Sequence, residues 1–209
     1  MTKKLLIKPI LVFDLGGVLL DWNPHYLYCD KLGLDPVEVD QFLQEVGFSA
    51  WNKEQDRGRP FTAATAELSA QFPHYHDLIH AYDQHYADSI RGVIQPVVDI
   101  LKIVKNKGFS LYVLSNWSAE KFREVRPQYE FFEWFDGMII SGEVGLIKPE
   151  KAIFDVLLER IGHPAEDCLF IDDHLPNIQA ASDLGFQTHH FQSAMQFHAA
   201  LLGLGILAS

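Results

Sequence analysis

Short apolar runs, each ended by polar or glycine residues, recur along this chain. Ile10 to Phe13 is such a run, and it is followed by Asp14 and a pair of glycines. Runs of this length between turn residues are typical of strands buried in a parallel sheet. The pattern predicts five strands, at 10–13, 111–114, 138–140, 169–171 and 188–191.

Between several of these runs, apolar residues recur at helical spacing. A helix predicted over 95–107 gathers its valines and leucines on one side and ends at Gly108. Two more helices are predicted over 151–161 and 176–184. Strands that alternate with helices indicate an α/β fold, here a Rossmann-like core with a mostly parallel sheet.

The segment from about Trp22 to Arg91 breaks this alternation. It offers no convincing strand, but it contains amphipathic helical stretches separated by glycine and proline, at 26–32, 37–46, 50–56, 62–72 and 77–90. We therefore predict a core of residues 1–21 and 92–209, with residues 22–91 inserted as a helical cap. Four aromatic residues are expected in the cap core, one of them lining a substrate pocket with Trp22 or Trp117: Trp51, Phe61, Phe72 and Tyr82.

Charge and composition narrow the function classes. The formal net charge of −11 argues against nucleic acid or an anionic membrane as a partner, but not against a small anion bound in a locally positive cleft. No apolar stretch approaches the ~20 residues of a membrane span. The start, residues 3–8, loosely resembles a signal peptide, but Lys8 and Pro9 interrupt it, so we predict a cytoplasmic protein.

Two features say less about function. Cys29 and Cys168 lie far apart, so we interpret both as reduced packing residues. The histidines, including His76, His80 and the pair at 189–190, have no acidic partner at a ligand spacing, which favours solvated side chains over a metal site. The apolar segment 199–207 can pack on its own core or on a neighbour, so the oligomeric state stays open.

Polar residues that carry chemistry cluster where the predicted strands end. The carboxyl ends of parallel strands meet at one edge of a sheet, and that edge is where open α/β sheets bind ligands. The residues brought together in this way are Asp14, Ser115, Asn116, Lys148, Asp172 and Asp173, with Asn177 shortly after.

This set contains what phosphoryl transfer from an ester to a carboxylate requires. A carboxylate that approaches a phosphate dianion is repelled by about 8 kcal/mol at ~4 Å and an effective dielectric constant of ~20. Repulsion of that size would slow the reaction by roughly six orders of magnitude. Asp14 with Asp173 can hold Mg²⁺ to offset it, and Lys148 adds a second positive charge. The Ser115 hydroxyl can donate to the other phosphate oxygens.

The same residues resemble the four ordered motifs of the haloacid dehalogenase (HAD) superfamily. The matching segments are Phe13-Asp14-Leu15-Gly16-Gly17-Val18-Leu19, Leu114-Ser115-Asn116, Lys148-Pro149, and Phe170-Ile171-Asp172-Asp173 with Asn177. Each motif alone is weak, but four in the right order and spacing are strong. The start and the double aspartate are most similar to the branch of sugar-phosphate phosphatases and the phosphatase domain of epoxide hydrolases.

The resemblance implies roles for these residues. Asp14 would be a covalent nucleophile that forms an aspartyl-phosphate, with Lys148 stabilising it and the transferring phosphoryl group. Ser115 and Asn116 would hold the phosphoryl group. Magnesium would be held by Asp14, the carbonyl of Gly16 and Asp173, with Asp172 assisting directly or through water. The implied function is Mg²⁺-dependent hydrolysis of a small organic phosphomonoester, with a sugar phosphate as one candidate substrate.

The chain departs from the family pattern at one position. Phosphatases of this family usually carry a second aspartate, as general acid and base, two residues after the nucleophile, where this chain has Gly16. A positioned acid or base is typically worth 10²- to 10⁴-fold in rate. Either another group takes that role, with Asp21, His174 and water as candidates, or activity is slow and favours good leaving groups.

The sequence leaves two other functions open. A 2-haloacid dehalogenase would use the same nucleophile without a metal, but Asp172 and Asp173 would then repel the acid, and only Arg57, Arg59 and Arg91 could grip it from the cap. A catalytically impaired relative would bind a phosphate ligand or a protein without turnover.

Overall fold

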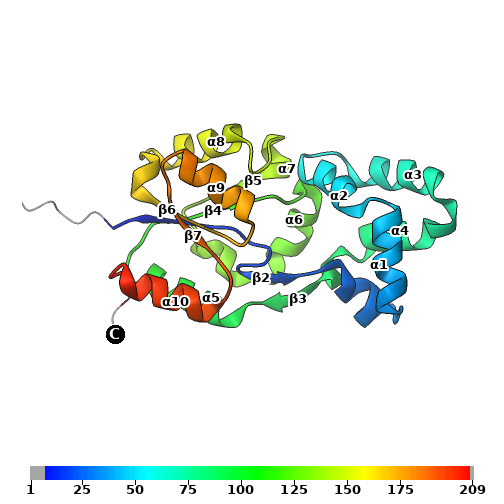
Figure 1. The fold of residues 1–209 in the computed structure, drawn as a ribbon, viewed down its shortest axis with the longest axis horizontal. Helices are drawn as coiled ribbons and strands as arrows, with labels where there is room; N and C mark the ends of the chain where they lie inside the picture. Colours follow the sequence, from blue (N-terminus) through cyan, green and yellow to red (C-terminus); the bar gives the residue numbers. More distant parts are fainter. Residues whose placement is uncertain (1–7, 208–209) are drawn as a thin grey trace, which may run out of the picture.

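A five-stranded parallel sheet forms the centre of the protein (Figure 1). The computed structural model describes residues 8–207, so most of the signal-like segment lies outside the described residues. The strand order is β5-β4-β1-β6-β7, and every neighbouring pair is parallel. The strands are β1 (Ile10–Phe13), β4 (Leu111–Ser115), β5 (Gly137–Ile140), β6 (Cys168–Asp172) and β7 (Gln187–His190). All five predicted strands are present within a residue or two, and the α/β Rossmann-like core is confirmed.

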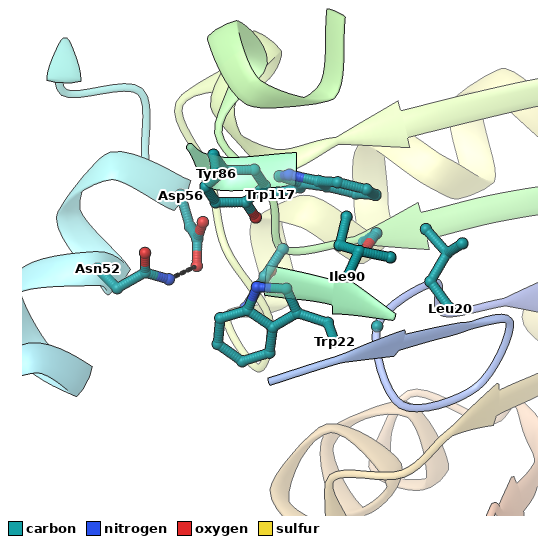
Figure 2. Close-up of a pocket in the computed structure, with 10 residues that line it drawn as sticks. Leu20, Trp22, Asn52, Asp56, Tyr86, Ile90 and Trp117 are labelled. Atoms are coloured by element: carbon teal, nitrogen blue, oxygen red, sulfur yellow. Dashed lines mark hydrogen bonds between the residues drawn. The ribbon is translucent and has the colours of Figure 1, made fainter. Parts of the chain in front are cut away.

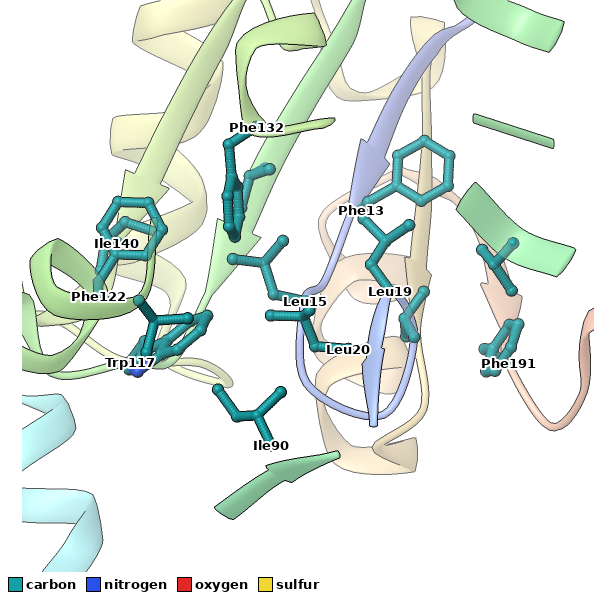
Figure 3. Close-up of a cluster of buried hydrophobic side chains, with 14 of the residues drawn as sticks. Phe13, Leu15, Leu19, Leu20, Ile90, Trp117, Phe122, Phe132, Ile140 and Phe191 are labelled. Atoms are coloured by element: carbon teal, nitrogen blue, oxygen red, sulfur yellow. The ribbon is translucent and has the colours of Figure 1, made fainter. Parts of the chain in front are cut away.

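Helices cover both faces of the sheet because successive strand residues point to opposite sides. Leu11 and Phe13 of β1 face one hydrophobic cluster, with α5 (Gln95–Asn106) and α10 (Ala194–Gly203). Val12 faces the other cluster, with α8 (Lys151–Ile161) and α9 (Leu175–Asp183). The loop after β1 adds Leu15 and Leu19 to the first cluster, and Leu20 follows at the start of the next strand (Figure 3).

The segment that was predicted to be purely helical is bounded by two strands. β2 (Leu20–Trp22) pairs antiparallel with β3 (Ile90–Val93). The prediction that the segment has no strand was therefore wrong at both of its ends. The helix predicted over 77–90 was too long, because α4 ends at Gln84. Between these strands lie η1 (Tyr26–Lys31), α1 (Pro36–Glu45), α2 (Phe48–Asp56), α3 (Phe61–Gln71), η2 (Pro73–Tyr75), α4 (His76–Gln84) and η3 (Tyr86–Ser89).

These helices gather at one end of the molecule, beyond the β2-β3 ribbon (Figure 1). Trp51, Phe61 and Tyr82 are buried in contact with one another, and Phe72 is partly buried against the same cluster. The division of the chain into core and cap stays a prediction.

The remaining elements are short. They are α6 (Ala119–Val125), η4 (Arg126–Gln128), η5 (Glu130–Trp134), α7 (Ser141–Val144) and η6 (Ala165–Asp167). The apolar C-terminal segment packs on its own core, since Leu201 and Ile206 are buried in the first cluster. Cys29 and Cys168 are both free, as predicted. In residues 8–207 no helix has the length and hydropathy needed to cross a membrane.

Candidate active site

Lys148 lies between two carboxylates at the carboxyl edge of the sheet. Its Nζ is 2.9 Å from Asp14 Oδ2 and 2.6 Å from Asp172 Oδ2. Strand register explains the meeting, because Phe13 is opposite Ile171 and the two aspartates follow directly. Lys148 is 2% exposed and Asp172 is completely buried. Burial opposes a charged lysine, but the two carboxylates outweigh it and raise the pKa of Lys148.

Asp14, the predicted nucleophile, carries a perturbed acidity. Burial raises the pKa of Asp14 to about 7, against the lowering effect of Lys148, and the charges of Asp172 and Asp173 add to the increase. The amide of Leu15 donates to Asp14 Oδ1 at 2.7 Å, which fixes one oxygen, while Lys148 holds the other. The carboxylate is therefore both oriented and short of compensating positive charge.

Asp172 is anchored on all sides. Asn177 Nδ2 lies 3.0 and 3.1 Å from its two oxygens, and the amide of His174 donates to Oδ1 at 2.8 Å. Together with the ion pair to Lys148, these contacts satisfy a carboxylate that would otherwise be costly to bury. Asp172 thus positions the lysine, and Asn177 from α9 positions Asp172.

Asp173 completes a group of three acidic side chains. Within residues 8–207, this is the one group of three or more possible metal ligands whose donor atoms lie within 4.8 Å of one another: Asp14, Asp172 and Asp173. Asp173 is exposed as a residue, but its carboxylate leans against Gly17, where an added Cβ would lie 2.2 Å from Oδ2. Partial burial, followed by the charge of Asp172, raises the pKa of Asp173.

Ser115 is the last residue of β4 and Asn116 follows it, and the two side chains have different surroundings. The Asn116 side chain accepts from the Lys148 amide at 2.8 Å and donates to the Lys148 carbonyl at 3.0 Å. This reciprocal pair ties the lysine loop to β4. Ser115 is 2% exposed and lines a cavity above the sheet edge, as does Gly16.

The cavity has a volume of about 160 Å³ and is lined mainly by aromatic and apolar side chains (Figure 2). Trp22 and Trp117 both line the cavity, but none of the four cap aromatics that were expected to join them does so, because these pack into the buried cluster instead. The indole nitrogens of Trp22 and Trp117 are buried and make no regular hydrogen bond with the described residues, although Tyr82 and Tyr86 lie near them. The other lining residues are Gly16, Leu20, Asn52, Asp56, Tyr86, Ile90, Ser115 and Asn116.

Sequence reasoning missed Asp56 and Asn52, both from α2. Asn52 Nδ2 donates to Asp56 Oδ2 at 3.2 Å, one turn apart in the helix (Figure 2). The two acid/base candidates chosen from the sequence lie elsewhere: Asp21 accepts from the Tyr26 hydroxyl at 2.7 Å, and His174 is exposed at the start of α9. One available signal was an aspartate at the C-terminal end of a helix, where the dipole disfavours negative charge.

The three arginines considered for gripping a haloacid are engaged away from the cavity. Arg57 donates two hydrogen bonds to Glu150, at 2.6 and 3.0 Å. Arg59 pairs with Glu67, and Arg91 pairs with an exposed aspartate at 2.7 Å. None of the three is among the residues that line the cavity.

Comparison with known proteins agrees with this arrangement. The family model for haloacid dehalogenase-like hydrolases matches residues 9–185, which include all the strand-end residues described above. The chain belongs to the haloacid dehalogenase-like hydrolases. It is therefore a hydrolase, and the family assignment made from its motifs is confirmed.

Both phosphatases and dehalogenases are among its relatives. The sesquiterpene phosphatase astK of Aspergillus oryzae is 25% identical over 201 residues, covering 88% of this chain and 90% of that protein. An (S)-2-haloacid dehalogenase of Pseudomonas fluorescens is 30% identical over 190 residues, covering 84% and 80%. Mouse bifunctional epoxide hydrolase 2 is 26% identical over 159 residues, which cover 73% of this chain but 28% of that protein.

A solved structure shares the fold. A family enzyme from Bacteroides thetaiotaomicron, crystallised with magnesium and inorganic phosphate, superposes with a TM-score of 0.65 at 20% identity, covering 88% of this chain and 94% of that one.

Proposed function

We propose that this chain is a Mg²⁺-dependent phosphatase that hydrolyses a small organic phosphomonoester through an aspartyl-phosphate on Asp14. The observation that carries the proposal is the charge balance at the sheet edge. Three carboxylates converge there, and Lys148 is the positive side chain in contact with two of them. A divalent cation would balance the excess negative charge, which a metal-free dehalogenase would have to leave in place.

The donor set fits magnesium. Mg²⁺ prefers oxygen ligands and is commonly held by one or two carboxylates together with water and substrate phosphate. Asp14, Asp173 and the carbonyl of Gly16 would hold it. Because Asp172 already accepts hydrogen bonds at both oxygens, it would act through water. Bound there, the ion would supply positive charge to the carboxylates and to a phosphate oxygen.

The protein's own groups account for the rest of the chemistry. The Asp14 carboxylate attacks phosphorus, with its orientation fixed by the Leu15 amide and Lys148. Lys148 stabilises the charge that gathers on the phosphoryl oxygens, and Ser115 donates to one of them. Asn116 holds the lysine loop in place through two hydrogen bonds, so we assign it a positioning role.

The dehalogenase alternative is less well supported. It needs a positive side chain that grips the carboxylate of a haloacid, and the three candidate arginines are paired with glutamate or aspartate outside the cavity. No lysine or arginine is among the described residues that line the cavity, so the carboxylate of such an acid would stay uncompensated there. The 30% identity to a dehalogenase nonetheless makes chloride release a necessary control.

Residues 22–91 would act as a cap that selects the substrate, because they contribute five of the ten cavity residues: Trp22, Asn52, Asp56, Tyr86 and Ile90. Indole faces suit sugar rings and apolar alcohols alike. A substrate screen should therefore include phosphates of both classes. Two free cysteines support a reducing compartment such as the cytoplasm.

The proposal is tested by phosphate release from p-nitrophenyl phosphate with and without Mg²⁺. We expect Mg²⁺-dependent release that Asp14→Asn lowers by about 10⁴-fold or more, as for other nucleophile deletions. Asp99→Asn, which changes an exposed aspartate of α5, should leave the rate unchanged. Acid-quenched wild type should carry one phosphoryl group on Asp14. No release with any divalent metal, together with chloride release from 2-chloropropionate, would overturn the proposal.

A further inference from the structure

Asp56 is a carboxyl group on the wall of the candidate active-site cavity. It is the last residue of α2 (Figure 2). It lines the cavity together with Gly16, from the loop after β1, and Ser115, the last residue of β4. The volume is only about 160 Å³, so a phosphoester held by Ser115 would bring its leaving group against the α2 side.

The local structure of α2 does not account for this carboxylate. A negative charge in the last turn of a helix opposes the helix dipole. The neighbouring cation, Arg57, turns away to pair with Glu150. The Asp56 backbone carbonyl, not its side chain, joins the helix to the core by accepting from the Ser141 hydroxyl at 2.5 Å. The side chain accepts from the Asn52 amide at 3.2 Å, lies near the Ser118 amide and lines the cavity.

Space for the leaving group exists between Asp56 and the nucleophile loop. A Cβ added at Gly16 would meet no atom within 4 Å, although the residue lies between the nucleophile Asp14 and the tightly covered Gly17. A carboxylate at position 16 would thus fill part of the cavity that Asp56 faces. An acidic side chain could reach this part of the cavity either from position 16 of the loop or from α2. In this chain the acidic side chain comes from α2.

We propose that Asp56 is the catalytic acid and base of the reaction, an inference that rests on the proposed phosphatase function. In the first step Asp14 forms a bond to phosphorus, the ester P–O bond breaks, and the Asp56 carboxylic acid gives its proton to the departing oxygen. The alcohol leaves, and Asp56 is a carboxylate. In the second step this carboxylate takes a proton from water, whose oxygen bonds to phosphorus as the Asp14–phosphorus bond breaks. Phosphate leaves and Asp56 is again protonated.

The surroundings of Asp56 suit both halves of that cycle. Burial raises its pKa to about 7, while the Ser118 amide and the charge of Lys148 lower it. A group poised near neutrality can donate and then accept a proton efficiently. Besides Lys148, the titratable groups that face it are two phenols with strongly raised pKa values, which stay neutral at physiological pH: Tyr82 from α4 and Tyr86 from η3.

The test varies the leaving group. An acid is needed when the departing oxygen is a poor leaving group and is nearly dispensable for p-nitrophenolate. We expect Asp56→Asn to lower kcat/KM about 10²- to 10⁴-fold for phenyl and propyl phosphate but less than about tenfold for p-nitrophenyl phosphate. The ratio kcat/KM is the correct readout because it covers the steps up to loss of the alcohol.

Rescue and control variants separate chemistry from structure. Gly16→Asp, combined with Asp56→Asn, should restore much of the alkyl phosphate activity by placing an acid on another part of the cavity wall. Glu54→Gln, an exposed carboxylate of the same helix, should behave as wild type. Asparagine at 56 can still accept from Asn52, so the thermal midpoint should change little.

Each outcome decides something. An equal loss for all esters, or no loss, overturns the role of Asp56 while leaving the phosphatase function intact. A wild type that already hydrolyses p-nitrophenyl phosphate far faster than propyl phosphate, with a steep dependence on leaving-group acidity, overturns it without any variant. A wild type that hydrolyses none of the esters overturns the phosphatase function, and the role of Asp56 falls with it.

Discussion

Gly17→Ala should weaken magnesium binding although it replaces none of the side chains proposed as ligands. The added Cβ would lie 2.2 Å from Asp173 Oδ2, and ordinary contact begins near 3.4 Å, so the carboxylate must retreat by 1.2 Å. Magnesium needs its ligands at ~2.0–2.1 Å in near-octahedral geometry. A retreat of this size removes Asp173 from the ligand shell, and we expect the Kd for Mg²⁺ to rise about tenfold or more.

Backbone strain must be separated from this effect. Gly17 has φ +73°, where an alanine costs about 1–2 kcal/mol relative to glycine. Gly33 has φ +74°, and a Cβ there meets nothing within 4 Å, so Gly33→Ala carries the same strain without the contact. Both variants should lower the thermal midpoint in EDTA by several degrees, about 2–4 °C for each kcal/mol.

Calorimetric titration with Mg²⁺ distinguishes the two variants. Gly33→Ala should bind the ion as wild type does, and Gly17→Ala should bind it more weakly. If Gly17→Ala binds Mg²⁺ with wild-type affinity while showing the same loss of stability as Gly33→Ala, Asp173 is not a ligand and the assignment of the site is wrong.

Three further predictions concern stability. In EDTA, Asp14→Asn should stabilise the fold by up to about 4 kcal/mol at pH 8, because a carboxyl pKa raised from 3.8 to about 7 destabilises the folded state progressively as the pH rises from about 4 to about 7. The gain should largely vanish near pH 4, and a difference in urea unfolding that does not change with pH would contradict it. Lys121→Met should lower the free energy of unfolding by about 2 kcal/mol, because the nearly buried Nζ of Lys121 lies 2.7 Å from a carboxylate oxygen of Asp83. An unchanged midpoint of urea unfolding would contradict this. Gly142→Ala should destabilise more than either glycine variant above, because its Cβ would lie 2.4 Å from the backbone nitrogen of Ala119; an unchanged thermal midpoint would show that this loop yields easily.

Four of the five parallel strands could be predicted because each is a mainly apolar run that a polar residue ends, whereas β7 is polar and partly exposed. Ile10 to Phe13 needs to be apolar on both faces, and Asp14 has to stop the run, so both the strand and its boundary are visible in sequence. The site residues at the strand ends follow from topology alone, because parallel strands bring their carboxyl ends to one edge.

Features that depend on long-range pairing were not predictable in this way. β2 has only three residues, one of them Asp21, and it forms a strand because Ile90 to Val93 lies beside it. The place of Asp56 in the site could not be predicted for the same reason. In sequence it is a polar residue at a helix end, and it lines the same cavity as Gly16 because segments 40 residues apart pack together.

The β2-β3 ribbon makes the helical segment a replaceable part. The chain leaves the core through Trp22 and returns through Ile90, its partner across the ribbon, so a short turn between them would close the core without moving a strand. If residues 22–91 form a cap as proposed, evolution can exchange the whole segment for another of different shape while the residues proposed as nucleophile, lysine and metal ligands stay unchanged. If Asp56 is the acid, such an exchange alters leaving-group preference and substrate choice in one event, whereas point mutations in the core could change neither without harming the phosphoryl site.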